Sequence, residues 1–336
     1  MKPFTHRAAG VQPRVLIVKL SSLGDLFHVL PLVHAIKSST GAVIDWVTQK
    51  EYCPVVTCFT EVARVISFPR HGFPRTWPSF LRALRLDAYD LVLDCQGLLK
   101  SAVVARMARG ERRIGPSFNR ECSRWLYDAI AGPRDKQRHA VEENLDMARA
   151  LGVAVQEIVF PVRFPPLETG IAHPRIGMVP VSRWETKNWP LEHFIELADA
   201  VAREMRASVC VFGGAQVGER TACERVARAA DGRGHNLAGR TSLTELGSWI
   251  AAMDLVVTND SGPMHIAAAL GVPVLALFGP TDPIRTGPYG ARHRVIVAPM
   301  ACRPCHGKVC MREDMACMRS ISPAVVVQAI REMIQQ

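Results

Sequence analysis

Short apolar runs alternate with helix-length amphipathic segments through the first half of the chain. The apolar runs lie at residues 14–18, 43–47, 62–68, 91–94 and near 113–115, and helical patterns lie between them at about 26–37, 50–58, 78–87 and 98–109. Apolar runs of this length, bounded by polar turns, are typical of buried parallel strands. Their alternation with helices predicts a doubly wound α/β domain.

A second alternation of the same kind follows a proline-rich segment. The amphipathic segment 139–152 predicts the last helix of the first domain, and residues 161–174 lack periodicity and predict a linker. The second series has strands at 176–181, 208–212, 254–258, 274–278 and 295–297, with helices at 190–206, 216–230, 242–252 and 322–335. We therefore predict an N-terminal Rossmann-like domain over 1–165, a second one over 172–320, and a C-terminal helix within 321–336.

Residues 259–283 hold the strongest local signal for a ligand site. The polar segment 259–262 (NDSG) follows an apolar strand, Pro263 suits the first turn of a helix, and Gly271 can end that helix. The amino end of such a helix offers unpaired N–H groups and a positive dipole end, so we predict a diphosphate site there. His265 lies in the first turn, where a purely structural histidine is the alternative to a binding one.

The net charge limits the partners. The 336 residues carry a net charge of +10, which favours anionic partners such as a nucleotide, a phosphate-bearing lipid or a membrane surface. The basic residues are spread along the chain, so nucleic acid is not a predicted partner. Residues 1–14 lack the apolar core of a secretory signal, and no apolar stretch approaches the about 20 residues that span a bilayer. We expect a cytoplasmic protein at the cytoplasmic face of the inner membrane.

The loop KLSSLGD (19–25) follows the first predicted strand. Ligands of open α/β sheets sit beyond the carboxyl ends of the strands, so Asp25 is a candidate general base. The alternative is a helix cap, because Asp is among the best capping residues. The loop lacks the GxGxxG pattern, which argues against an NAD-dependent oxidoreductase.

Loops of the second series offer groups for an anionic ligand. Arg183 and Lys187, in SRWETKNWP (182–190), are candidate ligands of an anion, and ordinary surface cations are the alternative. Glu219, in a glycine-rich turn, is a candidate acceptor of hydrogen bonds from a ribose or sugar hydroxyl. Thr281, in FGPTDP (278–283), lies beside the predicted phosphate site, although a tight turn alone would also explain that segment. No DxD motif is present, so no Mg²⁺ is predicted to bridge the diphosphate.

The first series offers side chains for an anionic acceptor. Gln96 and Lys100 follow the strand at 91–94, and Arg70 and Arg75 lie in a basic loop before the helix at 78–87. For the arginines, a solvated charged face is the alternative to acceptor binding.

Seven motifs occur in order between residues 18 and 283, namely VKLSSLGDLFHVLPLVHAIK, DCQGLLKSA, HAVEENL, TKNWPLEHF, NLAGRTSLTEL, NDSGPMHIAAALGVP and FGPTDP. Together they resemble glycosyltransferase family 9, the lipopolysaccharide heptosyltransferases that use ADP-heptose. The resemblance implies a GT-B fold with the active site between two Rossmann-like domains, and inversion at the anomeric carbon without a metal. The forms of DCQGLLKSA and HAVEENL look most like the branch that adds heptose to Kdo on lipid A.

The resemblance also implies roles for single residues. Asp25 matches the general base that deprotonates the acceptor hydroxyl, and Lys187 matches the lysine on the donor phosphate. Asp260 matches the acid that binds heptose hydroxyls. Ser261, Gly262 and His265 match the loop and helix that hold the donor and its diphosphate, and Thr281 matches the neighbouring phosphate loop. Ser182 and Arg183 are further candidates for donor binding, at a position where this chain departs from part of the family. In some first-step enzymes, paired threonines stand where this chain has Ser182 and Arg183.

Four of the ten cysteines gather late in the chain, with the spacing C-x2-C-x4-C-x6-C over Cys302, Cys305, Cys310 and Cys317. Four thiolates at this spacing predict a structural zinc or iron site, in which His306 could replace one cysteine. Free thiols and disulfides are the alternatives, and a reducing cytosol disfavours disulfides.

We therefore predict an inverting, metal-independent transferase that moves heptose from ADP-heptose to the Kdo or inner-core region of lipopolysaccharide. One alternative is a related transferase that acts on a later heptose or on another polysaccharide. The alternative of a different class is a non-catalytic nucleotide- or metal-binding regulatory module.

Overall fold

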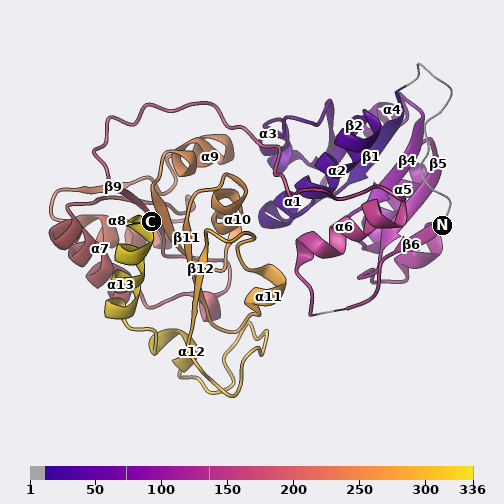
Figure 1. The fold of residues 1–336 in the computed structure, drawn as a ribbon. Helices are drawn as coiled ribbons and strands as arrows, with labels where there is room; N and C mark the ends of the chain where they lie inside the picture. Colours follow the sequence, from indigo (N-terminus) through magenta and orange to yellow (C-terminus); the bar gives the residue numbers. More distant parts are fainter. Residues whose placement is uncertain (1–11, 73, 136, 336) are drawn as a thin grey trace. The chain divides into compact units, whose positions relative to one another are not determined.

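The chain folds into two compact units in a computed structural model that describes residues 12–72, 74–135 and 137–335. The first unit runs through Arg163 and the second begins at Phe164. Figure 1 shows the first unit in indigo to magenta and the second in pink to yellow. No helix in the described part of the chain is long and apolar enough to span a bilayer.

The first unit is built on a six-stranded parallel sheet of order β3-β2-β1-β4-β5-β6. Its strands are β1 (Arg14–Val18), β2 (Val43–Gln49), β3 (Arg64–Phe68), β4 (Tyr89–Asp94), β5 (Gly110–Pro116) and β6 (Ala129–Ala131). The helical segments are α1 (Leu23–Phe27), α2 (Leu30–Thr40), η1 (Lys50–Tyr52), α3 (Cys53–Val56), α4 (Trp77–Leu84), α5 (Leu99–Met107), η2 (Ser123–Leu126) and α6 (Ala140–Ala150).

The second unit repeats this architecture with the order β12-β11-β10-β7-β8-β9. Its strands are β7 (Arg175–Val179), β8 (Ser208–Val211), β9 (Gly234–Asn236), β10 (Leu255–Asn259), β11 (Val274–Phe278) and β12 (Arg294–Val297). The helical segments are η3 (Glu185–Lys187), α7 (Leu191–Met205), α8 (Val217–Arg228), α9 (Leu243–Ala251), α10 (Gly262–Ala269), α11 (Pro283–Thr286), α12 (Ala316–Arg319) and α13 (Pro323–Ile334).

The strand order of each sheet reverses direction at its centre. The first strand of each unit pairs with the second strand on one side and the fourth on the other, so β1 lies beside β4 and β7 beside β10. The loops that leave such a pair at its carboxyl ends turn to opposite sides and open a crevice for ligands. The fold therefore brings residues 19–25 close to 95–98 in the first unit, and residues 180–187 close to 259–262 in the second. The predicted class, two doubly wound α/β units, is confirmed.

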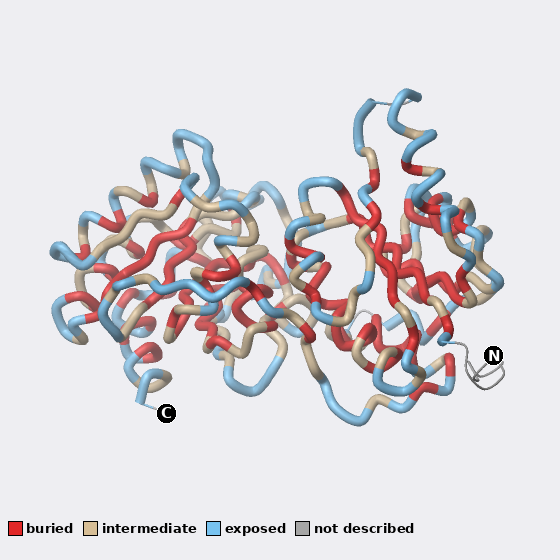
Figure 2. The backbone as a smooth tube through the Cα atoms, turned by 90° about the horizontal axis from the view of Figure 1, so that it is seen from above, coloured by how far each residue is buried: buried red, intermediate tan, exposed pale blue. Residues whose placement is uncertain are grey.

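The cores lie on both faces of each sheet. Strands β1, β10 and β11 are buried almost throughout, as expected for central parallel strands covered by helices on both sides. In Figure 2 the buried strands appear red, and the outer turns of the helices and the loops are pale blue. The last helix, α13, packs on α7 and buries Val326 and Ile330 in the core of the second unit.

Several local predictions differ from the structure. The predicted helix over 50–58 is instead the turn η1 followed by the single-turn helix α3, which has Pro54 in its first turn. The edge strands β6 and β9 were not predicted, because strands of three residues are too short to leave a periodic signal. By contrast, helix α10 begins at Gly262 with Pro263 in its first turn, and Gly271 beyond its end has the left-handed conformation, as predicted.

A buried carboxylate ties the amino edge of the first sheet together. Asp45 on β2 has no exposed surface, and its Oδ2 accepts hydrogen bonds from Arg14 Nη2 at 3.0 Å, Arg64 Nη2 at 2.7 Å and Tyr89 Oη at 2.9 Å. These contacts link β1, β2, β3 and β4. Because Tyr89 is buried beside this charge, its pKa is raised well above its ordinary value, chiefly by burial and then by the charge of Asp45.

Asp45→Ala should destabilise folding by about 3 kcal/mol, because the buried Tyr89 hydroxyl loses its acceptor and the two arginines keep only their ion pairs with Asp87. Urea unfolding followed by tryptophan fluorescence would measure the loss. The matched control is Asp199→Ala, which removes only a surface pair with Arg203 on α7 and should change stability by less than about 1 kcal/mol. Equal losses of unfolding free energy in the two variants would show that the Asp45 cluster contributes no more to stability than a surface ion pair.

Candidate active site

Asp25 lies in the loop-to-helix turn at the switch point of the first sheet. It is the third residue of α1, and its Oδ2 accepts hydrogen bonds from Ser22 N at 3.0 Å and Ser22 Oγ at 2.8 Å. Asp25 therefore closes a capping box from inside the helix, with Ser22 as the N-cap. The side chain remains 42% exposed, so its second oxygen is available to a ligand while the first is fixed.

Gln96 holds the loop that carries Asp25. Its Oε1 accepts hydrogen bonds from Leu20 N at 3.2 Å and Ser21 N at 3.1 Å. Gln96 is itself fixed, because its backbone N–H donates to Asp94 Oδ1 at 2.8 Å. The side-chain amide of Gln96 therefore positions the loop that carries Asp25. Its predicted contact with an acceptor stays a prediction.

Two cations beside Asp25 were missed by the sequence analysis. Lys19, only 5% exposed, donates from Nζ to Cys95 O at 2.9 Å, and His28 Nδ1 lies 3.7 Å from Asp25 Oδ1. Burial raises the pKa of Asp25, but the charges of Lys19 and His28 and the hydrogen bonds from Ser22 outweigh it and lower the pKa from 3.8 to about 2. The signal was available, since a lysine directly after the buried run 14–18 had to lie at the carboxyl end of that strand.

In the second unit, three predicted site residues meet at the switch point. Lys187 Nζ lies 2.7 Å from Asp260 Oδ2, and Thr281 Oγ1 donates to the same oxygen at 2.7 Å. The Lys187 and Asp260 side chains are 17% and 8% exposed. An ammonium group has three donors, so Lys187 can keep Asp260 and still reach an anion. The cluster thus joins the loops after β7, β10 and β11 around one carboxylate.

The polar segment after β10 is held in place by its own hydrogen bonds. Asn259 accepts from Trp189 N at 3.0 Å and donates to Pro180 O at 2.9 Å, which locks the loop after β7 to the end of β10. Ser261 is the N-cap of α10, and its Oγ lies 3.0 Å from Thr258 Oγ1. Gly262 opens the helix directly beside Asp260, so the free N–H groups of α10 lie next to the Lys187 ion pair.

The other residues predicted to bind the donor differ in their burial and hydrogen bonding. Ser182 Oγ donates within its own loop, to Asn188 Oδ1 at 2.7 Å or Trp184 O at 3.1 Å, so here it shapes the loop. Arg183 is exposed, and His265 is buried in α10. Glu219 Oε2 accepts from Gly214 N at 2.6 Å and closes the glycine-rich turn. Their contacts with a donor stay predictions.

The predicted acceptor arginines do not join the Asp25 loop through any contact among the described residues. Arg70 is exposed and lies 3.8 Å from Glu51, and Arg75 is exposed. Lys100 is exposed on α5, with Nζ 5.7 Å from the centre of the Phe68 ring. Only Gln96 among the four predicted acceptor residues contacts that loop.

The structure does not support the predicted metal site. Cys302 and Cys305 are exposed, Cys310 and Cys317 are half-buried, and all four are free thiols. In the parts of the chain that the structure describes, no group of three or more His, Cys, Asp or Glu side chains is arranged to hold a metal ion. Thiol spacing along the sequence was a misleading signal, because coordination needs the sulfur atoms to converge on one point.

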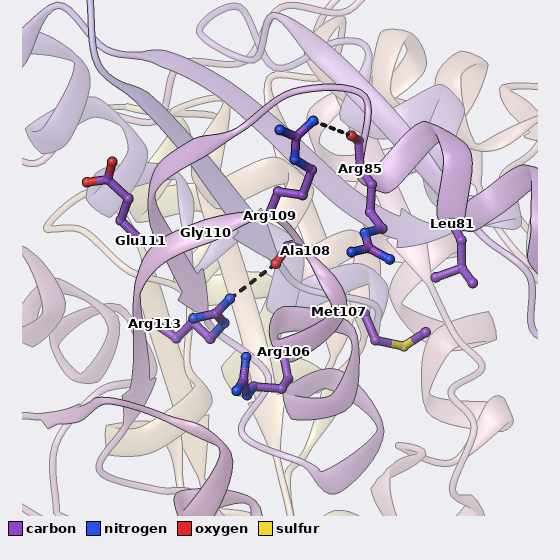
Figure 3. Close-up of a pocket in the computed structure, with 9 residues that line it drawn as sticks. All are labelled: Leu81, Arg85, Arg106, Met107, Ala108, Arg109, Gly110, Glu111 and Arg113. Atoms are coloured by element: carbon purple, nitrogen blue, oxygen red, sulfur yellow. Dashed lines mark hydrogen bonds between the residues drawn. The ribbon is translucent and has the colours of Figure 1, made fainter.

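A cationic pocket lies at the amino-terminal ends of the strands of the first sheet, whereas the Asp25 loop lies at their carboxyl ends. Its volume is about 460 Å³, and its walls are the ends of α4 and α5 and the start of β5. Figure 3 shows the guanidinium groups of Arg85, Arg106, Arg109 and Arg113 around it, with the Glu111 carboxylate directed away from Arg85 and Arg106. Arg113 is fixed by bonds to Ala105 O at 3.3 Å and Ala108 O at 3.2 Å.

Two doubly wound units, one with a loop-borne carboxylate and one with a Lys–Asp pair beside a helix amino end, define the class of GT-B glycosyltransferases. The sequence model of "Glycosyltransferase family 9 (heptosyltransferase)" matches residues 77–316. The chain belongs to this family, and it is a glycosyltransferase.

Relatives and solved structures agree with this assignment. The chain is 31% identical to lipopolysaccharide heptosyltransferase 1 of Pseudomonas aeruginosa, over 96% of this chain and 98% of that protein. It is 32% identical to lipopolysaccharide heptosyltransferase 1 of Escherichia coli K12, over 85% and 94% of the two chains. The structure of E. coli heptosyltransferase WaaC with ADP superposes with a TM-score of 0.76 at 28% identity, covering 95% of this chain and 99% of that chain.

Lys19→Met should raise the pKa of Asp25 from about 2 toward its ordinary value, because a buried positive charge beside the carboxyl is lost. A ¹³C NMR titration of labelled aspartates, with the Asp25 signal assigned by Asp25→Asn, would measure it. The depressed pKa also means that ionised Asp25 stabilises the fold above about pH 4 and that this contribution fades toward pH 2. The variant should lose this acid dependence, whereas the exposed control Lys50→Met should keep it; an unchanged pKa in Lys19→Met contradicts the assignment.

Proposed function

We propose that this glycosyltransferase moves heptose from ADP-heptose to the Kdo or inner-core region of lipopolysaccharide, with inversion and without a metal ion. The observation that carries the proposal is the cluster of Lys187, Asp260 and Thr281 at the amino end of α10. It combines a cation, a carboxylate and free backbone N–H groups, which are the groups that a sugar diphosphate needs. The names of the relatives, lipopolysaccharide heptosyltransferase 1, support the choice of sugar and acceptor.

The proposed reaction is a single displacement. The acceptor hydroxyl attacks the anomeric carbon, Asp25 takes the hydroxyl proton, and the bond from that carbon to the diphosphate oxygen breaks as ADP leaves. Lys187, Arg183 and the N–H groups at Gly262 balance the charge that grows on the leaving diphosphate. These fixed positive groups take the place that Mg²⁺ holds in transferases with a DxD motif, which this sequence lacks. Asp260, fixed by Lys187 and Thr281, would accept hydrogen bonds from heptose hydroxyls.

The assay that tests this proposal combines the protein with ADP-heptose and Kdo-lipid A, and follows the glycolipid by mass spectrometry. We expect the mass of one heptose to be added, with equal rates in EDTA and in Mg²⁺. An acceptor that already carries one heptose separates the first-step activity from a later one. Transfer only to that second acceptor would replace the proposed acceptor, and no transfer with bound ADP-heptose would favour a regulatory module.

In the same assay, Asp25→Asn should lower the turnover number by about 10²- to 10⁴-fold, the usual weight of a general base. The affinity for ADP-heptose, measured by calorimetry, should stay within about twofold, because the donor is assigned to the second unit. Asp128→Asn is the matched control, since this exposed carboxylate lies at the start of β6. Normal turnover in Asp25→Asn would remove Asp25 from the role of base.

Contact with an anionic membrane is a further part of the proposal, supported by the distribution of charge. Residues 1–163 contain 23 Lys and Arg against 15 Asp and Glu, whereas residues 164–336 contain 18 against 16, so most of the net charge lies in the first unit. On α5, exposed Leu99, Lys100, Val103 and Arg106 alternate apolar and basic groups along one face. Such a face suits the boundary between lipid headgroups and acyl chains.

Reversing two charges on this face, in Lys100→Glu with Arg106→Glu, should weaken binding to vesicles containing anionic lipid by at least about tenfold, since each basic residue near the surface adds about 1 kcal/mol. Co-sedimentation at low and high salt would measure it. The control reverses Arg203 and Arg228, which lie on helices of the second unit. Equal loss in both double variants would indicate attraction by net charge rather than a defined face.

A further inference from the structure

The cysteine-containing segment 302–317 is attached to the donor-site loops. Thr186 Oγ1, in η3, donates to Gly307 O at 2.8 Å, and His306 N donates to Pro280 O at 2.8 Å. The guanidinium of Arg303 donates to Gly279 O and also to Thr281 O at 3.4 Å. The segment is therefore hydrogen-bonded both to the turn that contains Lys187 and to the loop that carries Thr281.

This attachment places a second lysine at the aromatic ring that Lys187 contacts. The Nζ atom of Lys308 lies 5.4 Å from the centre of the Trp184 ring, and that of Lys187 lies 4.5 Å from the centre of the same ring. Trp184 and Thr186 belong to one short turn, so the hydrogen bond from Thr186 to Gly307 fixes the backbone next to Lys308. One aromatic ring thus attracts two ammonium groups that come from distant parts of the chain.

The two lysines differ in how their charges are balanced. Lys187 is paired with Asp260 at 2.7 Å, whereas Lys308 is exposed and has no ion-pair partner among the residues that the structure describes. Two ammonium groups held at one ring repel each other, and only one of them has a carboxylate. An anion with more than one negative charge would balance the pair, and a diphosphate is such an anion.

We propose that Lys308 is a second cation of the donor diphosphate site, held there by Trp184 and by the segment 302–317. The proposal rests on the proposed function, because it takes the diphosphate to lie beside Lys187. In this arrangement Lys187 with the amino end of α10 holds the diphosphate from within, and Lys308 approaches it from the solvent side. The segment 302–317 then serves the donor site through its lysine, independently of any metal on its cysteines.

The test is calorimetric titration of the full-length protein with ADP, AMP and adenosine. Lys308→Gln should bind ADP about five- to tenfold more weakly, because one charge-assisted contact to phosphate is lost at a solvent-exposed position. AMP should lose less, and adenosine should bind unchanged. Lys308→Arg should restore most of the ADP affinity. Arg312→Gln is the matched control, since this exposed cation in the same segment is paired with Asp314.

The possible results distinguish failure of the Lys308 inference from failure of the proposed function. If ADP binds to Lys308→Gln as to the wild type while Lys187→Met weakens it, the inference is overturned and the proposed function stands. If Lys308→Gln loses ADP and adenosine equally, Lys308 shapes the loop rather than contacting phosphate, which also overturns it. If the wild type binds no ADP, the proposed function fails and the inference fails with it.

Discussion

The ion pair between Lys187 and Asp260 is the interaction on which the second unit depends as a candidate donor site. It joins the loop after β7 to the loop after β10, and Thr281 brings in the loop after β11 through the same carboxylate oxygen. Burial of a lone carboxylate at this depth would be costly, and the ammonium group of Lys187 offsets that cost. The outcome is a preorganised cation beside a helix amino end, ready for an anion before one arrives.

In the first unit, the carboxylate after the first strand, Asp25, is stabilised by nearby positive charges rather than by a direct ion pair with a lysine. Lys19 and His28 keep Asp25 ionised, with a pKa of about 2, and Gln96 fixes the loop that carries it. A carboxylate with so low a pKa is a weak base toward a free hydroxyl. In a displacement reaction, however, the hydroxyl proton becomes acidic as the new C–O bond forms, so proton transfer can follow bond formation. Under the proposed mechanism, a carboxylate that is ionised at neutral pH is then sufficient to accept this proton.

Much of the fold and part of the site could be predicted from local pattern. The period of apolar residues placed all strands of the two sheet centres, and the polar loops at their ends pointed to Asp25 and Lys187. Asp260 was singled out by the resemblance to family 9. The pattern could not assign Gln96 its place, because its partners Leu20 and Ser21 are 76 and 75 residues away in the sequence. The pattern also predicted a metal site from four closely spaced cysteines, which the structure does not support. Spacing along a loop does not determine where the sulfur atoms point.

The sequence by itself therefore determined most of the secondary structure, the division into two α/β units and the loops in which candidate site residues lie. These properties depend on residues close together in the chain, whose apolar period and turn residues act locally. Only the tertiary structure decided which side chains meet, such as Lys187 with Asp260, 73 residues apart, or Lys308 with Trp184. The strand order brings such loops to one edge of a sheet, and a one-dimensional pattern does not encode that order.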